Sequence, residues 1–192
     1  MVKVKNIHHT ILSKAWATLK RIDFDYQFSS GKWKRLSREC YNRGNGTAIF
    51  LYNPQKGTVI LTKQFRMPAY ENDNNDGMSI EVCAGAIDSG DMPLETIVRE
   101  VEEEVGYKIT NAEQVSTAYM SPGAITEKMY FFIAEYNDKM KVNEGGGLDS
   151  ENEDIEVLEF QFEEVLEMLR DQEIKDAKTI MLIQYAQIHK LL

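Results

Sequence analysis

The stretch GAIDSGDMPLETIVREVEEEVGY, residues 85–107, decides how the rest of the chain is interpreted. After Pro93, which suits a first helical turn, the sequence contains no helix breaker until Gly106. The apolar side chains between these two residues recur three or four positions apart and share one helix face; they are Leu94, Ile97, Val98, Val101 and Val105. The pattern predicts an amphipathic helix over residues 93–105.

A second face of the same helix carries three carboxylates. Glu100, Glu103 and Glu104 are three and four positions apart, whereas Glu102 points elsewhere. Each like-charged pair on an open helix costs roughly 0.2–0.5 kcal/mol, and Arg99, four residues before Glu103, neutralises only part of this charge. One interpretation is a solvated acidic surface. The other is a site for a hard divalent cation such as Mg²⁺ or Mn²⁺, which takes oxygen ligands.

Composition and charge exclude several classes of protein. The 192 residues, 43% of them hydrophobic, suffice for one globular domain with a core and a small appendage. The net charge of −9 argues against a nucleic-acid backbone or an anionic membrane as partner, and no apolar run is long enough to span a bilayer. The N-terminus lacks an apolar signal core, and Cys40 and Cys83 have no paired spacing. We therefore expect a cytoplasmic protein with reduced thiols.

Residues 1–42 are expected to form a small antiparallel β-sheet, separate from the main domain. Apolar and polar residues alternate over 22–28, which is typical of a half-buried strand. A turn follows at 29–32, and the chain returns as a second strand over 33–41. So small a sheet is barely stable alone. It therefore has to pack either on its own main domain or on a partner subunit.

Residues 43–192 have the pattern of a larger α/β domain. Strands are expected at residues 47–53, 58–66, 78–84, 115–121, 127–136 and 155–160, and further helices at 163–171 and 176–188. Two polar segments, 71–77 and 137–154, are expected to be loops. A loop as long as the second, inside a compact domain, is usually functional or disordered.

The spacing around the acidic helix resembles the sequence box of the Nudix hydrolases. That pattern asks for Gly, five residues, Glu, seven residues, Arg-Glu, an aliphatic residue, any residue, Glu-Glu, any residue, Gly and an apolar residue. It matches Gly85 and residues 99–107, with Asp91 in place of a Glu that mainly supports the loop–helix–loop in the family. Average residue usage puts a chance match of the six invariant positions at about one chain per hundred thousand. The resemblance implies an α/β/α sandwich around a mixed sheet.

The resemblance also implies which residues bind metal and which act in catalysis. The implied metal ligands are the carbonyl of Ala84 and the carboxylates of Glu100, Glu103, Glu104 and Glu151, with Mg²⁺ as the cofactor and Mn²⁺ as a substitute. In related Nudix branches a Glu on a Gly-rich loop is the favoured general base, and the matching residue is Glu151, with Glu153 as an accessory. Glu103 and Arg99 complete the implied catalytic set. The other interpretation of this loop is a hydrated acidic segment.

Matches over nearly the whole chain resemble the branch of the family that hydrolyses GDP-mannose. The substrate contacts that this resemblance implies are Trp16, Ser37, Arg38, Glu39, Arg66, Glu127, Ser150 and Lys178. Trp16 replaces a usual Tyr and Ser37 a usual Lys, so the base preference is open. Without the resemblance, Arg66 would be interpreted as a surface charge and Glu127 as a solvent-facing turn residue.

Three functions are therefore considered. The first is Mg²⁺-dependent cleavage of a nucleotide sugar, GDP-mannose, to GMP and mannose 1-phosphate. The second is the same chemistry on ADP-ribose or other ADP-sugars. The third is a nucleotide-diphosphate sensor without turnover, which the presence of all three box glutamates disfavours. The resemblance also implies a homodimer in which the N-terminal sheet is swapped onto the partner.

Overall fold

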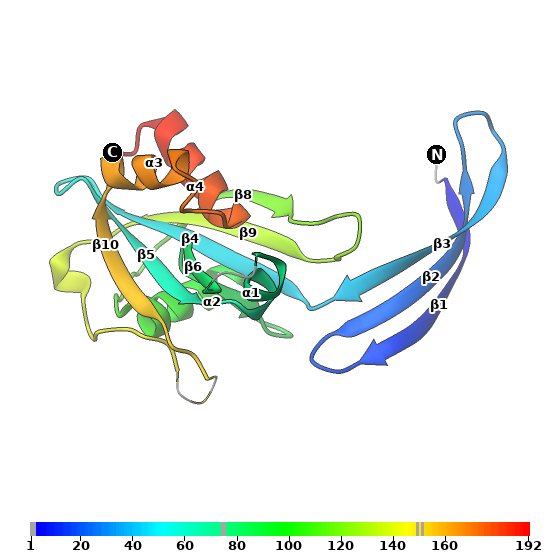
Figure 1. Cartoon of the computed structure of the whole chain (residues 1–192), viewed down its shortest axis with the longest axis horizontal. Coiled ribbons are helices and arrows are strands. Elements are labelled where there is room, and N and C mark those ends of the chain that lie inside the picture. The colour runs from blue at the N-terminus through cyan, green and yellow to red at the C-terminus, as the bar shows by residue number, and fades with distance from the viewer. Residues whose placement is uncertain (1–2, 74–75, 149, 151) are drawn as a thin grey trace. The chain divides into compact units, whose positions relative to one another are not determined.

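The computed structural model describes residues 3–73, 76–148, 150 and 152–192. The chain divides into two compact units, which are described separately (Figure 1). The N-terminal unit consists of Met1–Asn45 and Tyr119–Lys128, and the main unit of Gly46–Ala118 and Met129–Leu192. Within the described residues, no helix is long and apolar enough to cross a membrane.

The N-terminal unit is a three-stranded antiparallel sheet, which confirms the small sheet expected from the sequence. Its strands are β1 (Val4–Lys14), β2 (Thr18–Gln27) and β3 (Trp33–Asn42), in that spatial order. β1 was missed, because its sequence lacks a regular alternation, and its pairing with β2 shifts register between Lys5 and His8.

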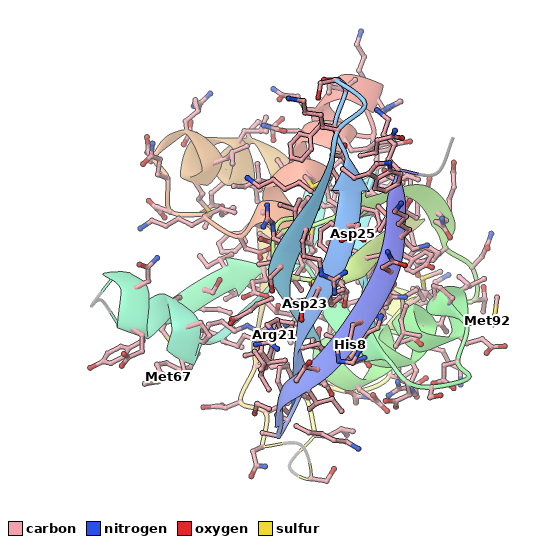
Figure 2. The ribbon with its side chains drawn as sticks, turned by 90° about the vertical axis from the view of Figure 1, so that its right-hand side faces the viewer. His8, Arg21, Asp23, Asp25, Met67 and Met92 are labelled. Carbon is pink, nitrogen blue, oxygen red and sulfur yellow. The ribbon has the colours of Figure 1, made fainter. Side chains whose placement is uncertain are left out.

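This sheet carries charged pairs along β2 and leaves apolar side chains in solvent. Arg21 Nε lies 3.3 Å from Asp23 Oδ2, and Asp25 pairs with Arg35 at 3.4 Å (Figure 2). None of the residues 3–45 is buried within the single chain. The large apolar side chains that are exposed here are Ile7, Ile11, Leu12, Trp16, Phe28 and Trp33. The sheet alone therefore has no core of its own.

The main unit is built on a mixed sheet of seven strands. Five strands follow the order β10-β5-β4-β9-β8, while β6 pairs with β5 and β7 with β4. The β4–β9 pair is parallel, and β5 is antiparallel to β4, β6 and β10. The strand bounds are β4 Asn45–Asn53, β5 Thr58–Phe65, β6 Met78–Glu81, β7 Ala84–Ile87, β8 Glu113–Tyr119, β9 Lys128–Glu135 and β10 Glu156–Gln161.

Helices cover both faces of this sheet, which confirms the α/β/α sandwich. Because side chains alternate along β4, Ile49 and Leu51 pack with Ile97 of α2, whereas Phe50 meets Phe162 of α3 on the opposite face. Figure 1 shows α3 and α4 together on that face. The helices are α1 Met67–Asp73, α2 Pro93–Glu100, the π-helical turn Val101–Val105, the 3₁₀ turn Asp138–Met140, α3 Phe162–Arg170 and α4 Ala177–His189.

Two local expectations were wrong, and the helix expected over 93–105 is confirmed with a change of geometry. Residues 67–73 form α1, although part of this segment was interpreted as a loop because of its polarity. The strand expected over 78–84 ends at Glu81, and a new strand, β7, begins at Ala84. The predicted helix over 93–105 changes from α to π geometry at Val101. Hydrophobic periodicity does not distinguish one helical hydrogen-bonding pattern from the other over so short a segment.

The π-helical turn ends at Gly106, which predicts a steric effect that can be measured. Replacing Gly106 with Ala is expected to destabilise the protein more than replacing Gly57. Both glycines have left-handed backbones, with φ of +76° and +69°, a geometry that costs about 1–2 kcal/mol for residues with a side chain. A Cβ at Gly106 would lie 2.3 Å from the carbonyl oxygen of Asn143, whereas at Gly57 the nearest atom would be 3.5 Å away. Urea unfolding of both variants measures the difference, and equal losses would contradict the steric argument.

Candidate active site

The acidic face of the Nudix-like helix lies beside its buried apolar face. Pro93 occupies the first turn, and Ile97, Val101 and Val105 are fully buried in the core. Packing of these apolar side chains holds the helix against the sheet in one orientation, so the directions in which its carboxylates point are fixed as well. Arg99 Nη1 lies 3.1 Å from Glu103 Oε2, the pair expected from their spacing, and Arg99 Nη2 lies 3.3 Å from Glu100 Oε1.

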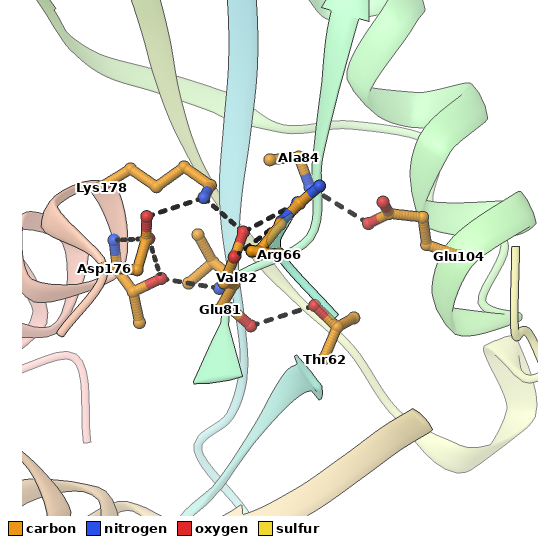
Figure 3. Close-up of polar contacts among 9 residues, drawn as sticks. Thr62, Arg66, Glu81, Val82, Ala84, Glu104, Asp176 and Lys178 are labelled. Carbon is orange, nitrogen blue, oxygen red and sulfur yellow. Dashed lines mark hydrogen bonds and ion pairs between the residues drawn. The ribbon is translucent and has the colours of Figure 1, made fainter. Parts of the chain in front are cut away.

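Glu104 is the most deeply buried carboxylate of this face, with 3% of the residue exposed. One oxygen accepts a hydrogen bond from the Ala84 backbone N–H at 3.1 Å (Figure 3). Burial raises the pKa of Glu104 to about 7, and the negative charges of Glu100 and Glu153 act in the same direction. Within the described part of the chain Glu104 has no ion-pair partner. A cation at this place would relieve the cost of the buried charge.

The backbone around Ala84 and Gly85 is closely packed beneath this acidic face. A Cβ at Gly85 would lie 2.3 Å from the carboxylate carbon of Glu100, so a larger residue there would displace the Glu100 side chain. Glu100 and Glu104 therefore both contact the backbone segment that bears the Ala84 carbonyl. Carboxylate and carbonyl oxygens are the donors that Mg²⁺ and Mn²⁺ prefer. The residues present thus fit a hard divalent cation, although among the described residues no three acidic, His or Cys side chains already form a closed ligand set.

A glycine-rich segment, Gly145–Gly147, attaches the predicted catalytic loop to the end of the same helix. All three glycines have positive φ, and Gly146 N–H donates to the carbonyl of Glu104 at 2.9 Å. A Cβ at Gly145 would lie 2.5 Å from that carbonyl oxygen. The loop that follows is braced by Glu153, whose carboxylate accepts from Leu148 N–H at 3.0 Å. Glu151, the predicted base, lies outside the described residues, and Ser150 is exposed.

A cavity of about 940 Å³ lies between the helix and this loop. Leu94 and Val98 supply apolar wall, Arg99 and Glu103 supply charge, and Leu148 closes the loop side. Arg99 and Glu103 therefore line a space large enough for part of a nucleotide sugar, whereas Glu100 and Glu104 are not among its lining residues.

Two predicted substrate contacts, Arg66 and Lys178, meet at a carboxylate that sequence reasoning missed. Arg66 donates from Nε and Nη2 to the two oxygens of Glu81, at 2.9 and 3.0 Å, and Lys178 Nζ lies 2.5 Å from Glu81 Oε2 (Figure 3). Arg66 is thus not an isolated surface charge. The available signal was a single Glu between Ile80 and Val82 in an apolar strand, which is typical of a buried charge with a partner.

Apart from Ser150, the other predicted substrate contacts lie in the N-terminal unit. Ser37, Arg38 and Glu39 are exposed on β3, and Trp16 is 80% exposed. Glu127 is buried, with its Oε1 2.8 Å from Arg43 Nε. It is therefore not the solvent-facing turn residue of the alternative interpretation.

Arg43 links two of these predicted contacts and was not singled out from the sequence. Its guanidinium carbon lies 5.7 Å from the centre of the Trp16 ring, while its Nε pairs with Glu127. The structure thus brings Trp16 and Glu127 to one arginine within the N-terminal unit. The box carboxylates, Arg66 and Lys178 gather in the main unit.

Two family models match the chain and cover nearly all of it. The NUDIX domain model matches residues 42–182. The model described as the GDP-mannose pyrophosphatase NudK N-terminal domain matches residues 3–41.

Curated relatives and a solved structure agree with these matches. A GDP-mannose pyrophosphatase of Yersinia enterocolitica is 50% identical over 191 residues, covering 100% of this chain and 98% of the relative. One of Pectobacterium atrosepticum is 49% identical, covering 94% and 92%. A crystal structure of an ADP compounds hydrolase matches with a TM-score of 0.68 at 19% identity, covering 97% of this chain and 94% of that chain, which shows the fold alone. The resemblance seen in the sequence is confirmed: the chain belongs to the Nudix family.

Proposed function

We propose that this protein is a pyrophosphohydrolase that cleaves GDP-mannose to GMP and mannose 1-phosphate with the help of divalent cations. The observation that carries the proposal is the carboxylate face of Glu100, Glu103 and Glu104, packed on the backbone of Ala84 and Gly85. The relatives that share about half of their residues with the full chain bear the name of this activity. Nudix hydrolases in general use divalent metal ions.

The metal ligands that we propose are Ala84 through its carbonyl, and Glu100, Glu103, Glu104 and Glu151 through their carboxylates, with Mg²⁺ preferred and Mn²⁺ as a substitute. When bound, such a cation neutralises phosphate oxygens and makes a bound water more acidic. Arg99 holds Glu100 and Glu103 in place through its two ion pairs. Glu151 is proposed to accept the proton of the attacking water. The hydrogen bond from Gly146 N–H to the carbonyl of Glu104 supports this role, because it holds the start of the loop next to Glu104.

The substrate contacts divide by chemistry. We propose that Arg66 and Lys178 bind the diphosphate, since a guanidinium suits bidentate phosphate contact and an ammonium supplies a compact charge. Glu127 and Ser150 are proposed to contact the sugar side. Trp16 and the segment Ser37–Glu39 are proposed to contact the base, Trp16 by stacking of its exposed ring.

The homodimer is also a proposal, with residues 1–42 as its dimerisation domain and residues 43–192 as the hydrolase domain. Its support is the set of exposed apolar side chains on a sheet without a core. A partner subunit that receives this sheet would remove them from water. A cytoplasmic location is proposed as well, supported by the two free thiols, Cys40 and Cys83.

The first prediction concerns metal binding by Glu104. Replacing Glu104 with Gln is expected to abolish most of the rise in melting temperature that Mg²⁺ or Mn²⁺ causes in the wild type, and to lower turnover at least a hundredfold, about 2.7 kcal/mol. Glu102→Gln is the matched control, because Glu102 lies in the same helical turn but points toward Lys108, 3.9 Å away. A Glu104→Gln protein that responds to metal like the control would contradict the assignment.

The second prediction separates the candidate substrates. With Mg²⁺, release of GMP from GDP-mannose is expected to exceed release of AMP from ADP-ribose, and EDTA is expected to stop both. Chromatography of the nucleoside monophosphates provides the measurement. Faster AMP release would retain the chemistry but assign the protein to ADP-sugars, with Trp16 and Ser37 as the residues to examine. No release from either compound would favour a sensor without turnover.

The third prediction concerns assembly. Light scattering after gel filtration is expected to give twice the chain mass of 22.1 kDa. Replacing Ile7 and Ile11 together with Asp is expected to raise the dimer dissociation constant at least tenfold, because these side chains, both more than half exposed in the single chain, would enter the interface charged. A wild-type protein that runs as a monomer at micromolar concentration would refute the dimer.

A further inference from the structure

Glu81 is a buried carboxylate for which the hydrolytic mechanism gives no role. It ends β6, where it pairs with Thr62 of β5 in the interior of the main unit. Only 4% of its side chain is exposed. A buried charge of this kind costs stability unless it is paired and hydrogen-bonded, so its partners indicate what it is for.

The partners of Glu81 are two cations, and they lie on its outer side. Arg66 makes a bidentate pair with the two carboxylate oxygens, and Lys178 binds one of them. The exposed fraction rises from 4% for Glu81 to 14% for Lys178 and 43% for Arg66. Burial by itself would raise the pKa of Glu81, but the hydrogen bonds and charges of Arg66 and Lys178 outweigh it and lower this pKa to about 2. The carboxylate is therefore charged at neutral pH and stands behind two cations that reach toward solvent.

Lys178 is held from its other side by the start of α4. Its Nζ lies 2.9 Å from Asp176 Oδ1, while Asp176 Oδ2 caps the helix by accepting from Thr179 N–H at 2.9 Å. The Thr179 hydroxyl accepts in turn from Val82 N–H at 2.8 Å, next to Glu81 in the chain (Figure 3). The lysine is therefore fixed in place relative to the strand that carries Glu81.

Arg66 keeps donors that this pairing does not use. A guanidinium has five N–H donors, and the bonds to Glu81 use one on Nε and one on Nη2. A long side chain held in one conformation before the ligand arrives loses less conformational entropy on binding. A single buried anion that orders two outward cations is therefore suited to prepare a site for an anion with two charged groups.

We propose that Glu81 is a positioning residue that holds Arg66 and Lys178 side by side for the diphosphate group of the substrate. It acts through these two side chains and does not itself contact the substrate. This role rests on the proposed function, in which Arg66 and Lys178 bind the diphosphate. It adds the residue that keeps the two cations at a fixed separation.

The test compares Glu81→Gln with wild type, with inorganic pyrophosphate as the probe. Glutamine has the same shape, but it is neutral, and in either orientation its amide NH₂ faces an N–H donor of Arg66, so the bidentate pair is lost. Calorimetry in EDTA, which keeps the metal site out of the measurement, is expected to give about a tenfold weaker pyrophosphate affinity, the size of losing one charge-assisted contact. With GDP-mannose and Mg²⁺, KM is expected to rise about tenfold while kcat changes less than threefold, because binding of the diphosphate is lost from ground and transition states alike.

Thr62→Val is the matched control for a merely structural effect. The Thr62 hydroxyl donates to the backbone carbonyl of Glu81 at 3.2 Å and is fully buried, so its loss weakens the same strand pair without touching the carboxylate. This variant is expected to lose stability but to keep the wild-type pyrophosphate affinity and KM. An equal loss of affinity in Thr62→Val and Glu81→Gln would overturn the positioning role.

Other outcomes are equally decisive. Unchanged or tighter pyrophosphate binding by Glu81→Gln would mean that Glu81 competes with the ligand for the two cations, and this would overturn the proposal. A wild-type protein that does not bind pyrophosphate would also overturn it. A wild type that binds pyrophosphate but does not hydrolyse GDP-mannose would refute the proposed function and leave the binding comparison valid. If Glu81→Gln does not fold, Glu81→Asp decides: it keeps the charge but is too short to reach both cations, and a wild-type affinity in that variant would overturn the proposal.

Discussion

The hydrogen bond from Ala84 N–H to the buried carboxylate of Glu104 is the contact on which the rest of the structure depends. A helix can place a charged side chain inside a protein only if neighbouring apolar side chains hold it there, and here Ile97 and Val101 do so. The Glu100 carboxylate packs against Gly85 so closely that a Cβ at this position would displace it. The acidic face and the backbone beneath it are therefore a single packed unit.

This arrangement concentrates negative charge where water is excluded, which opposes stability. The raised pKa of Glu104 is a direct sign of that cost. The positive charge of Arg99 offsets the repulsion between Glu100 and Glu103, with which it forms ion pairs, but Arg99 does not pair with Glu104. Glu104 thus remains a buried carboxylate without a cation beside it among the described residues, and the divalent cation that we propose would offset this cost.

The sequence predicted the parts of the fold that periodicity and spacing encode. The helix over 93–105, the small N-terminal sheet and, apart from α1 and β7, the order of strands and helices in the main domain follow from apolar patterns. The break between β6 and β7 and the pairing of Glu81 did not, because both depend on contacts between segments far apart in the chain. The π-helical turn did not because periodicity does not separate α from π geometry over so short a segment. Arg43 and Glu127 illustrate the same limit: 84 positions separate them, and no local pattern connects them.

Residues 81–84 show why the two charged clusters stay in register. At this segment the chain passes from β6, which pairs with β5, to β7, which pairs with β4. Glu81 O accepts from Thr62, Val82 N–H donates to Thr179, Cys83 O accepts from Ile49 N–H, and Ala84 N–H donates to Glu104. Four successive residues are therefore each tied to a different element. The proposed diphosphate, which would bridge the proposed metal and the two cations, would require a fixed distance between them, and a segment tied at four successive residues is suited to keep it, with Glu81 at one end and Ala84 at the other.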